Sequence, residues 1–165
     1  MREVSFDEFK ENAFNLIGKE WLIYAAEKDG KVNAMTASWG GLGIMWNKKV
    51  AYIFVRPQRY TKEFIDASDR MSISVLPESL RKTGTYFGRT SGRDEDKIEK
   101  SGLTVMHYED VPYFYESRLT MICKKLYAQS LDESSFLEKS LVDKCYPDKD
   151  FHVMYVVEIE KILEN

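Results

Sequence analysis

The chain has 165 residues with a formal net charge of −3, and hydrophobic residues make up 44% of it. This length and composition are typical of a globular protein with a proper core, so we expect residues 1–165 to form a single domain. The mixed charge argues against a nucleic-acid partner, because proteins that track phosphate backbones are usually strongly basic.

No targeting or membrane segment is expected. The first 14 residues carry charged side chains throughout, and no apolar run is long enough to cross a bilayer. The two cysteines, Cys123 and Cys145, have neither the Cys-x-x-Cys spacing of a redox pair nor a metal-binding pattern. The cytoplasm is therefore the expected compartment.

The first predicted element is an N-terminal helix. Ser5 and Glu8 have the spacing of a capping box, and apolar residues recur at helical spacing as far as Ile17. After it, the apolar run 21–26 predicts a strand. Asp29-Gly30 then predicts a tight hairpin leading into a returning strand over 31–39, because both turn residues accept a positive φ.

Short strands and short helices alternate along the rest of the chain. Pro57 and Pro77 follow two β-rich runs, which proline cannot continue. Thr61 is expected to cap a helix, and Gly102 to end another. The predicted strands are 50–55, 71–76, 118–129 and 151–162, and the predicted helices are 60–68, 78–87, 94–100 and 134–142. Strands joined by hairpins with short helices between them predict a mainly β fold, an antiparallel barrel with helical insertions.

Several common kinds of site are excluded by pattern. The only histidines, His107 and His152, lie in no cluster with zinc-ligand spacing, so no metal site is expected. A Gly-x-Ser-x-Gly hydrolase elbow is absent. Gly40-Gly41-Leu42-Gly43 resembles a dinucleotide-binding loop, but Ile44-Met45-Trp46 follows it where a helix should begin, so that fingerprint fails on context.

Three segments carry candidate binding chemistry, and the first is Asn33-Ala34-Met35-Thr36-Ala37-Ser38-Trp39. Small and hydroxyl residues at a strand end would bring backbone N–H and C=O groups close to a flat polar ring. The Thr36 and Ser38 hydroxyls would bond carbonyl or phosphate oxygens, and Trp39 would form a wall. Taken alone, the segment favours the simpler interpretation of a strand that ends in a turn, with Trp39 filling the barrel.

The second segment, 56–62, joins a predicted strand to a predicted helix. The guanidinium groups of Arg56 and Arg59 match phosphate oxygens, and the free N–H groups of a helix start add to the attraction. Pro57 would make the turn rigid. Because both arginines coincide with the helix start, an anion site is favoured here over a solvated basic loop.

The third segment, 88–97, is rich in glycine and charge and precedes a helix with Asp94 as its expected cap. Arg93 and Lys97, one helical turn apart, would face a second anionic or carbonyl group. A surface loop with internal ion pairs explains the pattern equally well.

Together the three segments resemble the flavin reductase-like family, in particular its flavoredoxin-type members. Residues 111–114 and 125–129, and His152 with Glu158-Ile159, extend the resemblance over nearly the whole chain. It implies an FMN-binding split β-barrel, a Greek-key antiparallel barrel with several short helices. It also implies a homodimer with FMN near the subunit interface. Val157 departs from many family reductases, which carry glycine there.

The same resemblance implies a set of site residues. Residues 36–39 would hold the isoalloxazine and ribityl portion of FMN, Arg59 and Thr61 the phosphate, and the 91–97 segment would close the pocket. His152 is the catalytic candidate and would face the nicotinamide side, with a strand histidine bonded to a neighbour as the alternative. The implied cofactor-binding residues are Thr36, Ala37, Ser38, Trp39, Arg56, Pro57, Gln58, Arg59, Tyr60, Thr61, Ser91, Arg93 and Lys97.

Three functions fit this pattern. The first is an NAD(P)H:FMN oxidoreductase, in which hydride passes from NAD(P)H to bound FMN. The second is a flavoredoxin-type electron carrier whose FMN is reduced by a redox protein partner. The third, a binding module that has lost the flavin, is disfavoured by the intact arginine and Ser/Thr positions.

Overall fold

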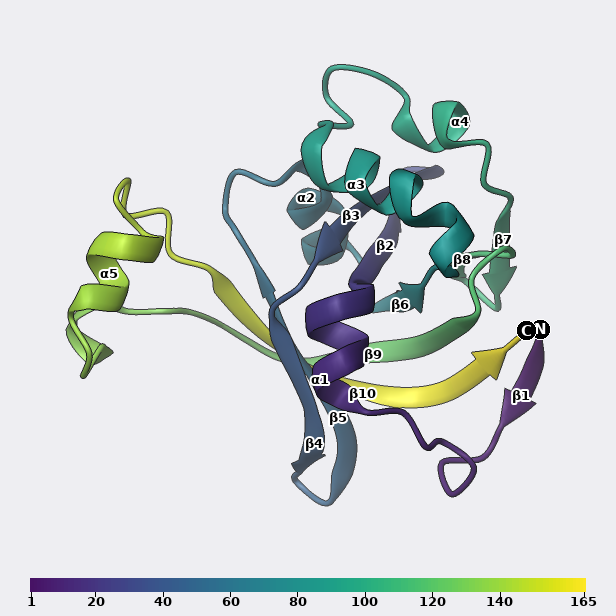
Figure 1. Cartoon of the computed structure of the whole chain (residues 1–165), viewed down its shortest axis with the longest axis horizontal. Helices are drawn as coiled ribbons and strands as arrows, with labels where there is room; N and C mark the ends of the chain where they lie inside the picture. The colour runs from purple at the N-terminus through teal and green to yellow at the C-terminus, as the bar shows by residue number, and fades with distance from the viewer.

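One large antiparallel sheet and a small hairpin make up the β structure of the computed structural model, which describes all of residues 1–165 (Figure 1). The large sheet has the strand order β3-β2-β6-β9-β10-β5-β4, with β1 added to β10. Its strands are β1 (Arg2–Val4), β2 (Leu22–Lys28), β3 (Lys31–Ala37), β4 (Gly40–Met45), β5 (Lys48–Val55), β6 (Arg70–Val75), β9 (Leu119–Ser130) and β10 (Val153–Glu164). The hairpin consists of β7 (Val105–Tyr108) and β8 (Val111–Phe114).

The sheet curls into a barrel because its two ends are joined almost directly. β3 and β4 lie at opposite ends of the strand order, yet only Ser38 and Trp39 separate them in the chain. The three peptide steps from Ala37 to Gly40 span at most about 10 Å, far less than the flat width of such a sheet at about 4.8 Å per strand. The predicted antiparallel barrel is confirmed.

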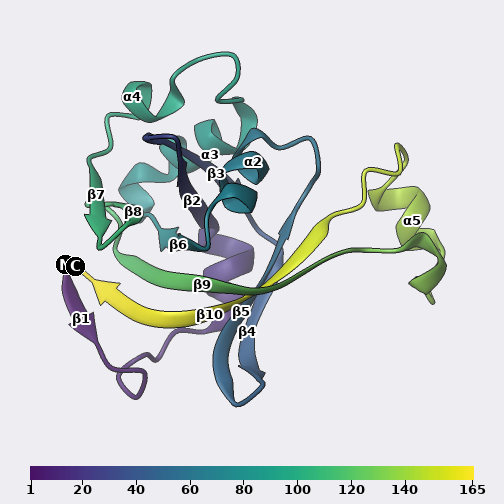
Figure 2. The same ribbon diagram turned by 180° about the vertical axis from the view of Figure 1, so that it is seen from behind.

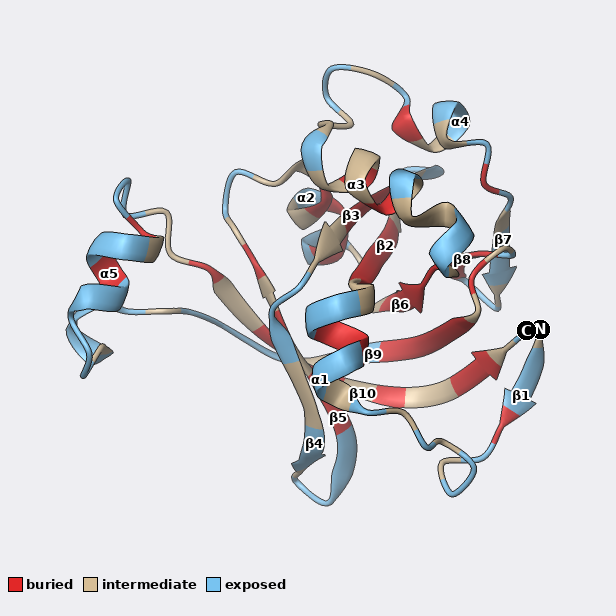
Figure 3. Cartoon of the chain, viewed as in Figure 1, coloured by how far each residue is buried: buried red, intermediate tan, exposed pale blue.

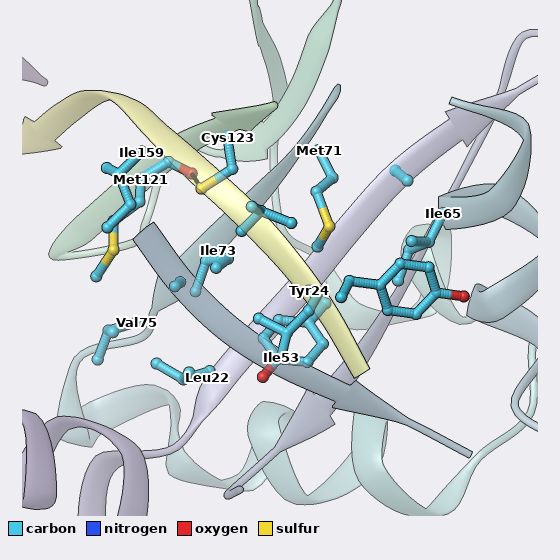
Figure 4. Packing of buried hydrophobic residues seen from close by; sticks show 14 of the residues in the cluster. Leu22, Tyr24, Ile53, Ile65, Met71, Ile73, Val75, Met121, Cys123 and Ile159 are labelled. Carbon is cyan, nitrogen blue, oxygen red and sulfur yellow. Dashed lines mark hydrogen bonds between the residues drawn. The ribbon is translucent and has the colours of Figure 1, made fainter. Parts of the chain in front are cut away.

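The barrel interior holds a cluster of 22 buried hydrophobic residues. Alternate residues of β2 and β6, such as Leu22, Tyr24 and Ile73, point into it, as do Ile53 of β5 and Met121 of β9 (Figure 4). The residues between them on β2 face outwards, where a second cluster lies under the helices. Because both faces of β2 are covered, its sequence is a continuous apolar run rather than an alternating one.

Short helices pack around the barrel: those between residues 78 and 101 cover this outer face, whereas the buried hydrophobic residues of those before residue 68 belong to the interior cluster. The helices are α1 (Ala13–Asn15), which continues as the π-helical turn η1 (Leu16–Glu20), α2 (Tyr60–Ala67), α3 (Arg81–Arg89) preceded by the 3₁₀ turn η2 (Glu78–Leu80), and α4 (Lys97–Ser101). Phe87 of α3 is fully buried against the outward residues of β2 and β3, and the exposed face of the helix carries charge (Figure 3). No helix of the structure has the length and apolar character needed to cross a membrane.

Residues 131–152 form an arm that projects from the barrel between β9 and β10 (Figures 1 and 2). The arm carries the 3₁₀ turn η3 (Glu133–Ser135) and the helix α5 (Ser140–Cys145). The helix predicted over 134–142 is therefore displaced toward the C-terminus. Most arm residues are exposed (Figure 3), and the arm packs chiefly on its own aromatic side chains.

The N-terminal prediction is wrong in its first part. Arg2–Val4 forms β1, which pairs with Ile162–Glu164, and the helix begins only at Ala13. Ser5 and Glu8 do form the predicted contact, with Glu8 Oε2 accepting from Ser5 N at 2.8 Å, but it closes an isolated turn. Residues 5–12, predicted to be helical, form this turn and irregular chain, and pairing with the end of β10 satisfies the backbone of residues 2–4.

One strand was not predicted, and two local predictions are corrected. Gly40–Met45, to which the sequence assigned no element, is an edge strand because it pairs along its whole length with β5. Thr61 lies buried inside α2, where its hydroxyl accepts from Asn33, and Arg59 occupies the cap position. α4 is capped by Asp96 instead of Asp94, with Glu99 N donating to Asp96 Oδ1 at 3.0 Å.

Candidate functional site

A pocket of about 310 Å³ opens where β3 leaves the barrel, between the ends of β5 and α3 and the start of β10. Four separate segments of the chain meet there, and the barrel topology brings them together. The lining residues are Met35, Thr36, Ala37, Ser38, Trp39, Phe54, Arg56, Arg59, Gly88 and His152.

The end of β3 is fixed by close contact with α3. The Thr36 hydroxyl donates to Gly84 O at 2.5 Å, and a Cβ on Gly88 would lie 3.5 Å from Thr36 Cβ. The hydroxyl of Tyr24, from inside the barrel, donates to Trp39 O at 3.3 Å. Ser38 and Trp39 are exposed at the mouth, so this edge offers hydroxyl and backbone groups to a ligand.

Two cations without an acidic partner lie at the C-terminal end of α3, Arg59 in the pocket lining and Lys97 behind it. Arg59 donates to Gly88 O at 2.8 Å, and Lys97 donates to Thr90 O at 3.0 Å and Phe87 O at 3.3 Å. Lys97 is 3% exposed, and neither side chain has a carboxylate within 4.0 Å. The C-terminal carbonyls of α3 thus hold both cations in place while leaving their charge uncompensated.

The uncompensated charge shows in the pKa values. Burial, with the nearby Arg59 charge adding to it, lowers the pKa of Lys97 to about 8. Burial also lowers the pKa of Arg59, which nevertheless remains a cation. A bound anion would relieve both effects, since an opposite charge favours the protonated form of each group.

Arg56, although it lines the pocket, is committed to the arm. Its guanidinium forms an ion pair with Asp150, donates to Cys145 O at 2.8 Å, and lies 5.2 Å from the ring centroid of Tyr146. Gln58 Nε2 donates to the same Asp150 oxygen at 2.5 Å. Arg56 and Gln58 therefore tie the arm to the barrel, and Arg56 has little capacity left for a phosphate.

The remaining sequence-predicted residues lie outside the pocket lining. Arg93 donates to Gln58 O and pairs with Glu63 at 2.5 Å, with its guanidinium over the ring of Tyr60. Ser91 Oγ accepts from Arg93 N at 3.2 Å. Arg93 thus links the 88–97 loop to α2. Pro57, Gln58, Tyr60, Thr61, Ser91, Arg93 and Lys97 are absent from the pocket lining.

His152 also lines the pocket and is 8% exposed. Its ring packs at 5.1 Å from that of Trp39 and at 6.5 Å, edge to face, from that of Phe54. Burial and the nearby Arg56 charge lower its pKa to about 4, although Asp150 acts in the opposite direction. The imidazole is therefore neutral at pH 7.

Sequence reasoning missed Phe54, Gly88 and Tyr146. Phe54 was within reach, because alternation along β5 places residue 54 on the same face as Arg56, opposite the buried Val55. Gly88 closes the pocket through a backbone approach that only the packed structure reveals. Tyr146 contacts His152 through the arm, and no local pattern connects the two residues.

Comparison with known proteins identifies the family. The model of the flavin reductase like domain matches residues 16–165, so the chain belongs to this family. The fold predicted from the resemblance, an FMN-binding split β-barrel with short helices, is confirmed. No curated protein matches the chain.

Similar solved structures lie below 25% identity and show the fold alone. Flavoredoxin from Methanosarcina acetivorans is 22% identical with a TM-score of 0.66, over 88% of this chain and 68% of that one. An FMN-binding domain of a flavin reductases-like enzyme from Shewanella baltica OS155 is 17% identical with a TM-score of 0.71, over 98% and 75%. The styrene monooxygenase flavin reductase from Pseudomonas putida S12 is 14% identical with a TM-score of 0.66, over 91% and 81%.

Proposed function

We propose that this chain binds one FMN in the pocket at the end of β3 and acts as an NAD(P)H:FMN oxidoreductase. The observation that carries the proposal is Arg59, a half-buried guanidinium in the pocket lining that no carboxylate compensates, with the buried ammonium of Lys97 bonded to the same carbonyl, Phe87 O, just behind it. The Arg59 guanidinium, with the Lys97 charge nearby, fits a phosphate group, which would supply the missing negative charge.

The rest of the pocket fits the other parts of the cofactor. Ser38 and the backbone of residues 35–39 offer polar groups at the strand end, and Trp39 and Phe54 offer flat apolar walls. When bound, FMN supplies the capacity to accept a hydride or single electrons. The protein's part is to hold the phosphate at Arg59, to position the ring system beside Trp39, and to keep a neutral imidazole in the pocket lining.

The first test is the visible absorption spectrum of the protein purified without added flavin, followed by heat release and identification of the chromophore. We expect a yellow protein that releases close to one FMN per chain. A colourless protein that also fails to bind added FMN would refute the proposal.

A second candidate function is a flavoredoxin-type carrier, reduced by a redox protein partner. It is favoured by an apolar hollow of about 450 Å³ beside the pocket, which shares Ser38 and Trp39 with it. Phe14 of this hollow is 88% exposed and, with its other apolar lining residues, forms a contiguous apolar surface that a protein partner would cover. Anaerobic addition of NADH or NADPH separates the two functions, since rapid bleaching of the flavin supports the oxidoreductase and its absence the carrier.

The proposal extends to the assembly. By the family resemblance we propose a homodimer, and the exposed apolar side chains of this chain mark the surface that a second copy would cover. Leu137 and Leu141 of the arm are 99% and 45% exposed, and Ile44 and Trp46 of the β4–β5 hairpin are 68% and 53% exposed.

A further inference from the structure

A tyrosine of the arm forms a hydrogen bond with the histidine of the pocket. Tyr146 Oη lies 2.8 Å from Nδ1 of His152, and Tyr146 is 4% exposed. Its ring packs against Phe136 and Phe151, with centroids 5.8 and 4.9 Å away, and the Arg56 guanidinium lies over it. The arm thus delivers a hydroxyl group to the edge of the imidazole and holds it there.

The direction of this hydrogen bond follows from the other partners of each group. Tyr146 Oη has no other hydrogen-bond partner in the structure. If Nδ1 carried the proton and donated, the Tyr146 O–H would be left without a protein acceptor at a buried position, which is unfavourable. If Tyr146 donates, both groups are satisfied. The hydroxyl is therefore the donor and Nδ1 the acceptor.

The second ring nitrogen of His152 is then the one available to a ligand. Nε2 makes no hydrogen bond within the protein, and it is not sealed from solvent, while the residue as a whole lines the pocket. In a neutral imidazole with Nδ1 accepting, Nε2 carries the hydrogen and is a donor.

We propose that Tyr146 is a positioning residue that fixes His152 as the Nε2–H tautomer, so that the imidazole donates a hydrogen bond to the carboxamide carbonyl of a nicotinamide ring. The identity of this acceptor rests on the proposed oxidoreductase function, whereas the tautomer does not. Trp39 on one side and Phe54 on another hold the imidazole in the orientation that Tyr146 selects.

The charges around the pair keep both partners neutral. Burial raises the pKa of Tyr146, against the opposing effect of Arg56, so the phenol keeps its proton. Burial and Arg56 lower the pKa of His152, against the opposing effect of Asp150, so the imidazole accepts none at pH 7. His152 thus orients a polar group of the electron donor without transferring a proton to it.

The test uses long-range ¹H–¹⁵N correlation spectra of the full chain, in which protonated and bare ring nitrogens are distinguished directly. The chain has only two histidines, so exposed His107 serves as the internal reference. At pH 7 we expect His152 to show a protonated Nε2 and a bare Nδ1. In Tyr146→Phe, which keeps the ring but removes the hydroxyl, we expect a mixture of tautomers at His152 and no change at His107.

A matched control separates the hydroxyl from packing. Phe136→Leu loosens the same aromatic cluster but leaves the hydroxyl, so its His152 should keep the Nε2–H tautomer. For turnover, Tyr146→Phe should raise the KM for NAD(P)H about fivefold, the loss expected from one misdirected hydrogen bond. Its kcat and its dissociation constant for FMN should stay within about twofold of the wild type.

A wild-type spectrum with Nδ1 protonated, or identical tautomer populations in the wild type and Tyr146→Phe, would overturn the inference. A shift of equal size in Phe136→Leu would also overturn it, because the effect would then come from packing. The tautomer is measured on flavin-free as well as flavin-loaded protein, so a failure to bind FMN or to oxidise NAD(P)H counts against the proposed function alone.

Discussion

Arg59 and Arg93 were both predicted to bind an anion, but the contacts that each makes in the structure decide whether its guanidinium is available. Arg59 donates only to the backbone oxygens at the end of α3, whereas Arg93 is already paired with Glu63. We expect Arg59→Met to raise the dissociation constant for FMN about tenfold to a hundredfold, the worth of one charge-assisted hydrogen bond. Arg93→Met should change it much less. Fluorescence titration of the flavin-free variants measures both, and equal losses would remove the phosphate role from Arg59.

His152 should also make the free energy of unfolding depend on pH. Its pKa is lowered to about 4 in the folded chain from an ordinary 6.5, so between these values the unfolded chain binds more protons. Stability is therefore lost as the pH falls from 6.5 to 4, by about 3 kcal/mol at 1.36 kcal/mol per pKa unit. Arg56 and Asp150 are the charged groups that face the imidazole, with Tyr146 bonded to it.

Urea unfolding of the wild type and His152→Gln at pH 7 and pH 4 checks this. The carboxylates titrate alike in both proteins, so the difference in free energy of unfolding isolates the histidine. From pH 7 to pH 4 the free energy of unfolding of the variant, relative to that of the wild type, should rise by about 3 kcal/mol. Parallel pH dependences would mean that the imidazole is as free to ionise in the folded chain as in the unfolded one.

Among the structural elements, the junction of β3 and β4 depends on a single glycine. A Cβ on Gly40 would lie 2.7 Å from the carbonyl oxygen of Tyr52, which belongs to the paired strand and cannot move aside. A Cβ on neighbouring Gly41 would make an ordinary 3.5 Å contact with the Tyr52 ring. We expect Gly40→Ala to cost about 2 kcal/mol more than Gly41→Ala in urea unfolding. Similar values would mean that the junction relaxes freely.

The attachment of the arm to the barrel should depend on Arg56. Arg56 holds the arm through Asp150 and Cys145 O, from a strand of the barrel. In Arg56→Met we expect amide hydrogen exchange to accelerate within residues 131–152 while the barrel strands keep their protection. Arg59→Met is the control and should leave arm exchange unchanged, since Arg59 makes no hydrogen bond or ion pair with the arm. Equal exchange in both would show that the aromatic cluster alone holds the arm.

These elements also show how far the sequence alone could lead. β2, β3, β5, β6, β9 and β10 were predictable because apolar runs and turn residues are local features. β1 and β4 were not, since charged Arg2–Val4 and the glycines of β4 become strands only through pairing with distant partners. Local patterns carry no information about such pairings.

In the candidate site too, some residues were predictable from the sequence and others depend on partners that are distant in the chain. The segment 36–39 and Arg59 were predictable as lining residues because motif and family resemblance both lead to them, and His152 was predictable from the resemblance alone. The commitment of Arg56 to the arm depends on Asp150, 94 positions away in the chain. The sequence shows that Arg56 can bind an anionic group, but only the fold shows that this group is the Asp150 carboxylate.

At the scale of the whole molecule, the arm is hard to explain for an isolated chain. It carries Leu137, fully exposed, on a segment that stands away from the barrel (Figure 2). The β4–β5 hairpin likewise exposes Ile44 and Trp46. The ring centroid of Trp46 lies 6.3 Å from that of Tyr127 of β9, which is also exposed. Side chains of this kind, gathered on projecting elements, are typical of surfaces that another protein covers.

A homodimer that covers this surface should therefore weaken when its apolar side chains become charged. A stable dimer buries about 800 Å² per partner, roughly a tenth of this chain's 8975 Å² of accessible surface. We expect Leu137→Glu and Trp46→Glu to shift sedimentation equilibrium toward monomer, with dissociation constants raised at least about tenfold, because each would bury an unpaired carboxylate. Lys28→Glu, at the distant β2–β3 hairpin, is the matched control and should sediment like the wild type. If the wild type sediments as a monomer at every concentration, the dimer is refuted. If it is a dimer that both variants leave intact, the partner copy sits on another face.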